Sequence, residues 1–402
     1  MSDFILTVNA GSSSIKFALY AVDGDWTAPN VFGQVDGIGG GRGLDTSFKI
    51  RDGKGNTLHE GRIAASGDSA PSHHEAMSAV LGWLRQAQPQ GSVVAVGHRI
   101  VHGGERFLAP AIVDDRVLDD IGALAGFAPL HQPHNVAGVR AARAAFTDIP
   151  HIACFDTAFH HTQPDLNRRF ALPQNLHDAG VKRYGFHGLS YESIQAQISR
   201  QDNGPNKARV VVAHLGNGAS MCAMRDGRSV ATTMSFSPLD GLPMGTRCGR
   251  LDAAVVLHLL QQHQLSADEI SLLLNRESGL LGLSGVSSDM RTLRASSSSA
   301  ARMAIDYFVE HLQREVAGMA AALHGIDLLV FTGGIGENDA ALRASVVEGV
   351  GWMDMQLDVE ANLAGAICIS ARSSKVEVRV LRSNEEAVIA RHVARAIGRL
   401  AD

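Results

Sequence analysis

A short apolar run that ends in a turn rich in Gly, Ser and Asn occurs twice in this chain of 402 residues. The first copy reads LTVNAGSSS from residue 6, and the second reads VVAHLGNGAS from residue 211. Each continues through an alternating segment to an Asp-Gly pair, at residues 23–24 and 226–227. Both patterns are typical of a strand that turns back into a hairpin. The repetition predicts two related domains, each of which begins with a hairpin.

Strands and helices alternate along the chain, which predicts the α/β class. Apolar runs of strand length occupy residues 4–8, 93–96, 151–155, 209–213 and 327–331. Three helices are marked by the residues before them: a capping box at 72–75, a serine run at 296–299 and an Asn-Glu-Glu segment at 384–386. We expect the second of these helices to end at Gly325.

The composition excludes several classes of protein. With 36 Lys and Arg against 41 Asp and Glu and no basic cluster, the chain is unsuited to binding nucleic acid by its phosphates. Four cysteines stand singly, which fits neither a disulfide framework nor a zinc site and indicates a reducing cytoplasm. The first apolar run is too brief for a signal peptide, and no segment has the roughly 18–20 apolar residues of a membrane span.

Glycine is in excess, with 42 residues, and predicts tight turns or loops whose backbone lies against a ligand. Residues 33–71 are expected to be loops with a peripheral hairpin at 46–58. Four other loops combine Gly with polar side chains, at residues 9–16, 214–218, 284–291 and 333–338. P-loop, Rossmann, zincin and nucleophile-elbow motifs are absent. Because the N–H groups of such loops can hold an anion, four of them predict a phosphate-binding cleft between two similar domains.

Seven ordered motifs resemble the acetate kinase family. They lie at residues 9–17, 98–104, 155–160, 184–188, 214–218, 244–249 and 334–338. The resemblance implies an α/β fold of two duplicated ribonuclease H-like (actin-like ATPase) domains, each with a βββαβαβα core, and an active-site cleft between the domains. The implied boundaries are 1–155 plus 387–402 for the N-terminal domain, which the C-terminal helix completes, and 156–386 for the nucleotide-binding domain.

The activity implied by the resemblance is reversible transfer of the γ-phosphoryl group of ATP to acetate, giving acetyl phosphate and ADP by direct in-line transfer. Mg²⁺, or Mn²⁺ in its place, would be the cofactor, and ATP/ADP the co-substrate. The resemblance also implies a cytoplasmic homodimer that serves acetyl-CoA biosynthesis, with neither nucleic acid nor membrane as a partner.

Site residues follow from the resemblance position by position. The catalytic set would be Arg99, Asp156, His187 and Arg247, and Asn9 and Glu385 would hold the metal. The substrate carboxylate and its methyl group would contact Arg99, Val101, Leu130, Phe186 and Pro238. The nucleotide and its phosphates would be bound by Ser12, Ser14, Lys16, His214, Leu215, Gly216, Asn217, Gly218, Asp289, Met290, Arg291, Gly334, Ile335, Gly336, Glu337 and Asn338.

Phosphoryl transfer between two anions depends on positioning and on charge neutralisation, which suits Arg99 and Arg247. The role of Asp156 is open at this point. A carboxylate substrate is ionised at pH 7 and has no proton to give up, which favours Asp156 as an orienter of an arginine or of a metal-bound water over an acid/base. A covalent aspartyl phosphate is the other role.

The sequence also departs from the family pattern. Leu189 and Tyr191 stand where Thr and His are usual, which leaves the hydrogen bonds around His187 open. Gln132-Pro133-His134 replaces Asn-Pro-Pro, and Arg250 stands where an acidic residue is common.

Several alternatives stay open. Propionate or butyrate could be the substrate, because one methylene is worth only about 1–3 kcal/mol in an apolar pocket. The chain could instead be a non-enzymatic actin-like ATPase, or a metal-dependent hydrolase. The hydrolase would use histidines 98, 131, 134, 160 and 161 with Asp156. Arg99 and His102, which follow a predicted strand, could simply be solvated loop residues.

Overall fold

The computed structural model describes residues 3–11, 14–24, 26–38, 46–63, 70–86, 91–201 and 209–400. They belong to two compact units: unit 1 is Met1–Ala158 with Asn384–Asp402, and unit 2 is Phe159–Ser383. These bounds lie a few residues from the boundaries expected from the sequence. The difference places Asp156 and Glu385 in unit 1.

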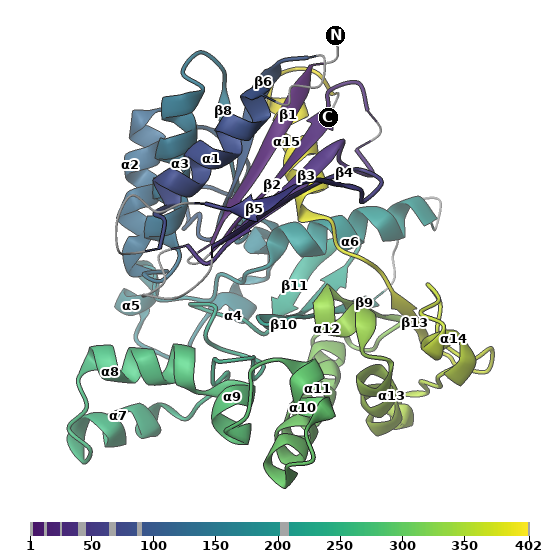
Figure 1. Ribbon diagram of the computed structural model, residues 1–402. Helices are drawn as coiled ribbons and strands as arrows, with labels where there is room; N and C mark the ends of the chain where they lie inside the picture. Colours follow the sequence, from purple (N-terminus) through teal and green to yellow (C-terminus); the bar gives the residue numbers. More distant parts are fainter. Residues whose placement is uncertain are drawn as a thin grey trace. The chain divides into compact units, whose positions relative to one another are not determined.

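Unit 1 is built on a sheet whose described strands have the order β5-β4-β3-β2-β1-β6-β8-β7 (Figure 1). The strands are β1 (Phe4–Ala10), β2 (Ser14–Ala21), β3 (Val31–Asp36), β4 (Ser47–Asp52), β5 (Thr57–Arg62), β6 (Val93–Ile100), β7 (Ala111–Ile112) and β8 (His151–Phe155). Strands β1 to β5 are antiparallel, while β6 is parallel to both β1 and β8. The hairpin expected at residues 46–58 is confirmed as β4 and β5, at one edge of the sheet.

Helices cover both faces of this sheet. On one face, Val96 of β6 packs in one core with residues of α1 (His73–Gln86), including Met77. A Cβ on the next residue, Gly97, would lie 2.4 Å from Ile389 and 2.7 Å from Val393 of α15 (Glu385–Ala396). Because successive strand residues face opposite ways, α15 covers the face opposite to α1. The missing side chain of Gly97 allows this close approach.

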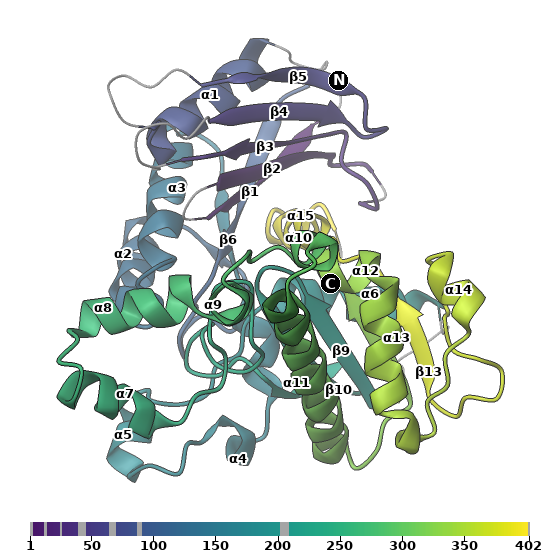
Figure 2. The same ribbon diagram turned by 60° about the horizontal axis from the view of Figure 1, so that its bottom comes forward.

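Unit 2 is built on a second sheet, of order β11-β10-β9-β12-β13. The strands are β9 (Arg209–Leu215), β10 (Ala219–Arg225), β11 (Arg228–Thr232), β12 (Leu328–Thr332) and β13 (Glu377–Val380). Helix α6 (Gly188–Gln201) covers one face through Tyr191, Ile194 and Ile198. The long helix α11 (Ser299–Leu323) packs on β9, β10 and β11 from the other side (Figures 1 and 2).

The two sheets repeat one strand order. In β3-β2-β1-β6-β8 and in β11-β10-β9-β12-β13, three antiparallel strands are followed by two parallel ones. This confirms the duplicated α/β fold. Each repeat is followed by a helix that covers the sheet of the other repeat, because α6 packs in unit 2 and α15 packs in unit 1.

The helix boundaries predicted from local signals are confirmed. In the capping box before α1, Ser72 N donates to Glu75 Oε2 at 2.7 Å and Glu75 N donates to Ser72 Oγ at 3.2 Å. Helix α11 ends at Leu323 and is followed by His324 and Gly325, both with positive φ (59° and 130°). Asn384 caps the start of α15, where its Oδ1 accepts from Ala387 N at 2.9 Å.

A helical region between β11 and α11 was not predicted. It comprises α7 (Ala253–Gln261), α8 (Ala267–Leu272), α9 (Gly279–Ser284) and α10 (Met290–Ala295). The apolar residues of α7 occupy 253–257 and 259–260, with only His258 between them, and none of them is buried, so the sequence lacks the alternation of an amphipathic helix. None of the helices in the described ranges combines the length and apolarity needed to cross a bilayer.

Candidate active site

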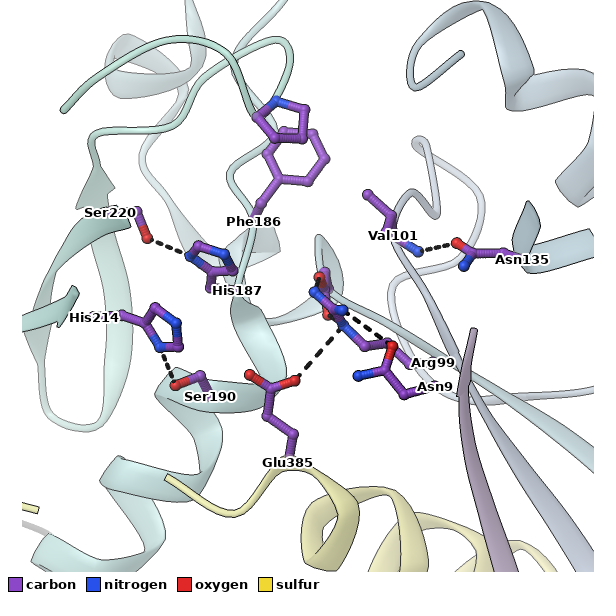
Figure 3. Close-up of polar contacts among 12 residues, drawn as sticks. Asn9, Arg99, Val101, Asn135, Phe186, His187, Ser190, His214, Ser220 and Glu385 are labelled. Atoms are coloured by element: carbon purple, nitrogen blue, oxygen red, sulfur yellow. Dashed lines mark hydrogen bonds and ion pairs between the residues drawn. The ribbon is translucent and has the colours of Figure 1, made fainter. Parts of the chain in front are cut away.

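Three predicted site residues of unit 1, Asn9, Asp156 and Glu385, meet at the guanidinium of a fourth, Arg99. Figure 3 labels Asn9, Arg99 and Glu385. Asp156 accepts with both carboxylate oxygens, at 3.0 Å from Nε and 2.5 Å from Nη2. Asn9 Oδ1 accepts from Nη1 at 3.2 Å, and Glu385 Oε2 lies 3.7 Å from Nε. The structure therefore places one cation among three oxygen-bearing side chains.

The order of the strands explains this arrangement. Asn9 lies on β1, Arg99 on β6, and Asp156 directly follows β8, so three neighbouring parallel strands supply them at one edge of the sheet. Glu385 is the first residue of α15. The expectation that Arg99 follows a strand is wrong: β6 continues through His98 and Arg99 to Ile100, and Arg99 pairs with Cys154 of β8. The sequence did not predict this extension beyond the apolar run at 93–96, because His98 and Arg99 are polar.

The cluster is only partly open to water. The Asp156 side chain is 1% exposed, whereas Arg99 and Glu385 are 20% and 17% exposed. Burial alone would lower the pKa of Arg99, but the charges of Asp156 and Glu385 raise it, so the guanidinium stays charged. Burial and the neighbouring Glu385 raise the pKa of Glu386.

Arg99 retains capacity to bind an anion. Of the five N–H groups of a guanidinium, Asp156 takes two and Asn9 takes one. One N–H on Nη1 and one on Nη2 have no acceptor among the residues that the structure describes. Two N–H groups can pair with two oxygens of a carboxylate or a phosphoryl group.

The segment after Arg99 is held by a buried amide. Val101 N donates to Asn135 Oδ1 at 2.9 Å (Figure 3), and Asn135 Nδ2 donates to Ala10 O at 2.8 Å. Val101 is 5% exposed, and Leu130 is half-buried. Asn135 lies on α3 (Gln132–Ala145) and was missed, because nothing in the sequence connects it with residues 10 and 101.

The predicted phosphate loop of unit 1 is described in part. Ser12 lies outside the described residues. The Ser14 carbonyl accepts from Gly11 N at 2.8 Å. Lys16 is exposed and lies directly opposite Asn9 in the β1–β2 ladder, so both side chains are on one face of the sheet.

In unit 2, His187 lies in a strained backbone position with φ 58°. A positive φ is uncommon for a residue with a side chain. Its Nδ1 lies 2.8 Å from Ser220 Oγ, and its ring stacks on His214 with 4.3 Å between ring centroids. Ser190 Oγ lies 2.8 Å from His214 Nδ1 (Figure 3). Ser220 and Ser190 were missed, although Ser220 follows the Gly-rich turn and lies opposite His214 in the β9–β10 ladder.

Tyr191, one of the departures from the family pattern, joins this network. Its side chain is fully buried, and Oη lies 2.5 Å from Ser220 Oγ. Burial raises the pKa of Tyr191 well above its ordinary value, so the hydroxyl keeps its proton. Leu189 is also buried, in the first turn of α6.

Arg247 and His187 both approach Gly218. A Cβ on Gly218 would lie 3.5 Å from His187 Nε2 and 3.7 Å from Arg247 Nη1. Arg247 Nη1 donates to Pro238 O at 3.1 Å.

Phe186, a predicted residue of the substrate pocket, is fully buried, and its carbonyl oxygen lies 2.9 Å from His160 Nε2.

The loop that carries Arg247 is fixed by α9. Leu280 N donates to Met244 O at 2.8 Å, and Leu281 N donates to Gly245 O at 3.0 Å. Gly279, which begins α9, has φ 62°, and a Cβ there would lie 2.1 Å from Met244 O. Only glycine fits this position.

Three of the predicted nucleotide loops line one pocket of about 710 Å³ in unit 2. The predicted residues that line it are Gly216, Asn217, Asp289, Met290, Arg291, Gly334, Ile335 and Asn338. Those outside its lining are His214, Leu215, Gly218, Gly336 and Glu337. Ser288, which lies in the candidate loop at 284–291, lines it as well. Arg294 and Asp339 also line it and were missed, although Asp339 adjoins the predicted Asn338.

Local hydrogen bonds explain two of these outcomes. Glu337 Oε1 accepts from Gly333 N at 3.0 Å, so this carboxylate turns back onto the first turn of α12 (Gly333–Asn338). Asp289 caps α10, and hydrogen bonding by Arg291 is the main cause that lowers the pKa of Asp289 to about 2. The ion pair of Arg294 with Asp339, at 2.6 Å, ties α10 to the segment after α12.

The residues that could hold a metal are Asn9 and Glu385. Amide and carboxylate oxygens are the ligand types that Mg²⁺ prefers, with substrate phosphates and water completing its shell. Asn9 supplies an amide oxygen and Glu385 a carboxylate, and both lie beside Arg99, so the types and closeness of these oxygens fit the ion. No group of three or more His, Cys, Asp or Glu is arranged to bind a metal within the described ranges.

Comparisons with known proteins agree on one family. A sequence model described as the acetokinase family matches residues 4–391. An acetate kinase of Methylocella silvestris is 49% identical over 403 residues and covers 100% of both chains. A propionate kinase structure from Francisella tularensis has a TM-score of 0.90 at 33% identity, covering 98% of this chain and 100% of its own. An acetate kinase structure from Porphyromonas gingivalis has a TM-score of 0.85 at 33% identity, with the same coverage.

Proposed function

The chain belongs to the acetokinase family, and we propose that it transfers the γ-phosphoryl group of ATP to acetate, reversibly, giving acetyl phosphate and ADP. The observation that supports this most strongly is the Arg99 cluster. A charged guanidinium held on one side by a buried carboxylate keeps two N–H groups for an anionic substrate. Relatives named acetate kinase that are up to 49% identical favour acetate as that anion.

Arg99 binds the carboxylate of the substrate in this proposal. Its contact with Asp156 fixes the plane of the guanidinium, so the substrate oxygen is oriented for in-line attack on the γ-phosphorus. A covalent aspartyl phosphate would require an Asp156 oxygen to leave Arg99, which would cost the paired contacts at 3.0 and 2.5 Å. Asp156 therefore acts as an orienter of Arg99.

The residues of unit 2 act on the nucleotide. The 710 Å³ pocket is large enough for a nucleoside and is lined by the turns at 216–217 and 334–335 and by α10. Arg247 and His187 donate to the transferring phosphoryl oxygens, where charge develops in a loose transition state. Ser14, Lys16 and the remaining predicted nucleotide residues support the phosphates.

Mg²⁺, or Mn²⁺ in its place, would be held by Asn9 and Glu385. Such an ion supplies neutralisation of the β- and γ-phosphate charge when it is bound. The contribution of the chain is to keep both oxygen ligands beside Arg99 without a direct hydrogen bond between Glu385 and the guanidinium, since 3.7 Å separates Nε from Oε2.

A hydroxylamine trap for acyl phosphate tests the proposal. The assay uses the purified chain with Mg·ATP and acetate, with Arg99→Ala and Arg247→Ala as loss-of-function controls and a reaction without metal. We expect acetyl hydroxamate only from the complete mixture. Equal product from wild type and both variants would refute the assignment.

Propionate is the second candidate substrate, because a propionate kinase structure is among the similar ones. Comparing kcat/KM for acetate, propionate and butyrate decides between them. A higher value for either longer acid would replace acetate in the proposal.

We further propose that the chain works as a cytoplasmic homodimer in acetyl-CoA biosynthesis, with no nucleic-acid or membrane partner. The four free cysteines suit a reducing compartment. Exposed apolar residues on α7, including Leu257 at 53%, supply a surface that association would cover. Sedimentation equilibrium tests the dimer, and a single species of 42.6 kDa would contradict it.

A further inference from the structure

We propose that Tyr191 and Ser220 form a hydrogen-bonded chain that fixes the tautomer of His187, so that a neutral imidazole carries its proton on Nε2. Both are positioning residues, because they act through His187. The inference deepens the proposed function and rests on it only where it concerns phosphoryl transfer. The direction of each hydrogen bond follows from the partners that the structure offers.

The chain begins at the Tyr191 hydroxyl. The ring is fully buried, and among the residues that the structure describes the one hydrogen-bond partner of Oη is Ser220 Oγ, at 2.5 Å. A buried donor must be satisfied, and the phenol keeps its proton because burial raises the pKa of Tyr191 well above its ordinary value. Tyr191 therefore donates to Ser220.

Ser220 connects Tyr191 to His187. It is fully buried, and its hydroxyl has a second partner in His187 Nδ1, at 2.8 Å. Since Ser220 Oγ accepts from Tyr191, its own hydrogen is available for His187 Nδ1. Nδ1 is then the acceptor of the imidazole, and the ring proton is on Nε2. A proton on Nδ1 would leave the Ser220 hydrogen without an acceptor in the described part of the chain.

The orientation of His187 gives this tautomer a use. Nε2 would lie 3.5 Å from a Cβ on Gly218, and the same Cβ would lie 3.7 Å from Arg247 Nη1. Nε2–H and the Arg247 guanidinium thus present donors to one place. The strained φ of 58° at His187 and the stacking on His214 at 4.3 Å keep the ring there. Two donors at one place suit the oxygens of the transferring phosphoryl group, over which negative charge is spread in a loose transition state.

Histidine ¹⁵N NMR reads the tautomer directly and needs no turnover. The chain has 18 histidines, and the His187 signals are identified by their loss in His187→Asn. At pH 8 we expect an unprotonated Nδ1 and a protonated Nε2 in the wild type and in Ser220→Thr, which keeps the hydroxyl. In Ser220→Ala we expect averaged shifts from two tautomers. A protonated Nδ1 in the wild type, or no change in Ser220→Ala, would overturn the proposal.

Ser229→Ala is the matched control. Ser229 Oγ lies 2.9 Å from His160 Nδ1, so this variant also removes a buried serine hydroxyl from a buried histidine. We expect it to leave the His187 shifts and kcat unchanged. A change in His187 equal to that in Ser220→Ala would show a general loss of packing and would overturn the assignment.

Kinetics test the coupling. Ser220→Ala is expected to lower kcat roughly tenfold, the size of one lost hydrogen bond, with KM for acetate and ATP within about twofold of wild type. Tyr191→Phe is expected to lower kcat by a smaller factor and to add nothing in the Ser220→Ala background, where the double variant also removes the stranded Tyr191 hydroxyl. Independent, multiplicative effects would refute the chain. If the wild type makes no acetyl phosphate, the proposed function fails while the NMR result still decides the tautomer.

Discussion

Replacing Asp156 by Asn tests whether this carboxylate acts only by holding Arg99. The amide keeps the size of the side chain, but its NH₂ group cannot accept from the guanidinium, so at least one of the contacts at 3.0 and 2.5 Å is lost. Removing one partner of a buried ion pair costs about 3–5 kcal/mol. Because Arg99 is 20% exposed and keeps Glu385 at 3.7 Å, we expect a loss of about 3 kcal/mol in the free energy of unfolding.

The effect on catalysis follows from the same geometry. A reacting group misplaced by about 1 Å costs about 10²-fold in rate, and loss of a transition-state arginine costs about 10³-fold or more. If Asp156 acts only through Arg99, Asp156→Asn lowers kcat about 10²-fold in the wild type and has no effect in the Arg99→Ala background. The double variant then keeps about 10⁻³ of the activity instead of 10⁻⁵, a coupling free energy of about 2.7 kcal/mol.

The hydroxylamine assay measures kcat, and urea unfolding at each pH and temperature used verifies that all variants are folded. Asp115→Asn is the control, since its ion pair with Arg143 at 2.8 Å is highly exposed at Asp115 and is worth at most about 1 kcal/mol. An equal 10²-fold loss in both backgrounds would refute the orienting role. Label from γ-³²P-ATP that stays on the denatured wild type and disappears in Asp156→Asn would replace it with a covalent one.

Three further predictions concern stability and specificity. Burial lowers the pKa of His160 from 6.5 to about 4, so the folded state disfavours the charged form: its contribution is fully present above about pH 6.5 and is lost as the pH falls toward 4. Urea unfolding at several pH values gives the free energy of unfolding as a function of pH. In that window this free energy should change with pH less steeply in His160→Gln than in the wild type, by up to about 1.4 kcal/mol per pH unit. The same pH dependence in both proteins would contradict this. Gly279→Ala should destabilise unit 2 by about 3 kcal/mol or more, because the added Cβ would lie 2.1 Å from Met244 O. Gly285→Ala is the control: this glycine has φ 63° but open space around it, so the substitution should cost only about 1 kcal/mol. Equal losses in the free energy of unfolding, measured with urea, would disprove the steric argument. Val101→Ala should raise kcat/KM for propionate relative to acetate about tenfold. Val113→Ala, at a similarly buried valine of unit 1, should leave the ratio unchanged; the hydroxamate assay with both acids measures it.

Local signals in the sequence were sufficient for several elements. The capping box at Ser72 and Glu75 and the Asn384 cap involve residues three apart, so the chain encodes them without tertiary structure. Strand β8 begins and ends at the residues of the apolar run at 151–155. The sequence predicted the duplicated hairpins because both turns are rich in Gly, Ser and Asn.

Long-range contacts were not readable. Tyr191 and Ser220 meet because α6 packs on strands that follow it in the sequence. No residue spacing in the sequence predicts that contact. Asn135 joins residues 101 and 10 through the packing of α3 on β1 and β6. Arg99, Asp156 and Glu385 came from a family resemblance; their distances depend on the strand order and on α15, which only the folded chain reveals.

The exchange of helices between the two repeats sets an order of events during synthesis. Unit 2 is one continuous stretch of chain, but the sheet of unit 1 lacks the helix that covers Gly97 until residues 385–396 have left the ribosome. That same last segment carries Glu385. A nascent chain therefore displays an uncovered apolar sheet face, a natural target for chaperones, from the completion of β8 at residue 155 until α15 is made. Products of premature termination before residue 384 lack both Glu385 and the helix that covers this face.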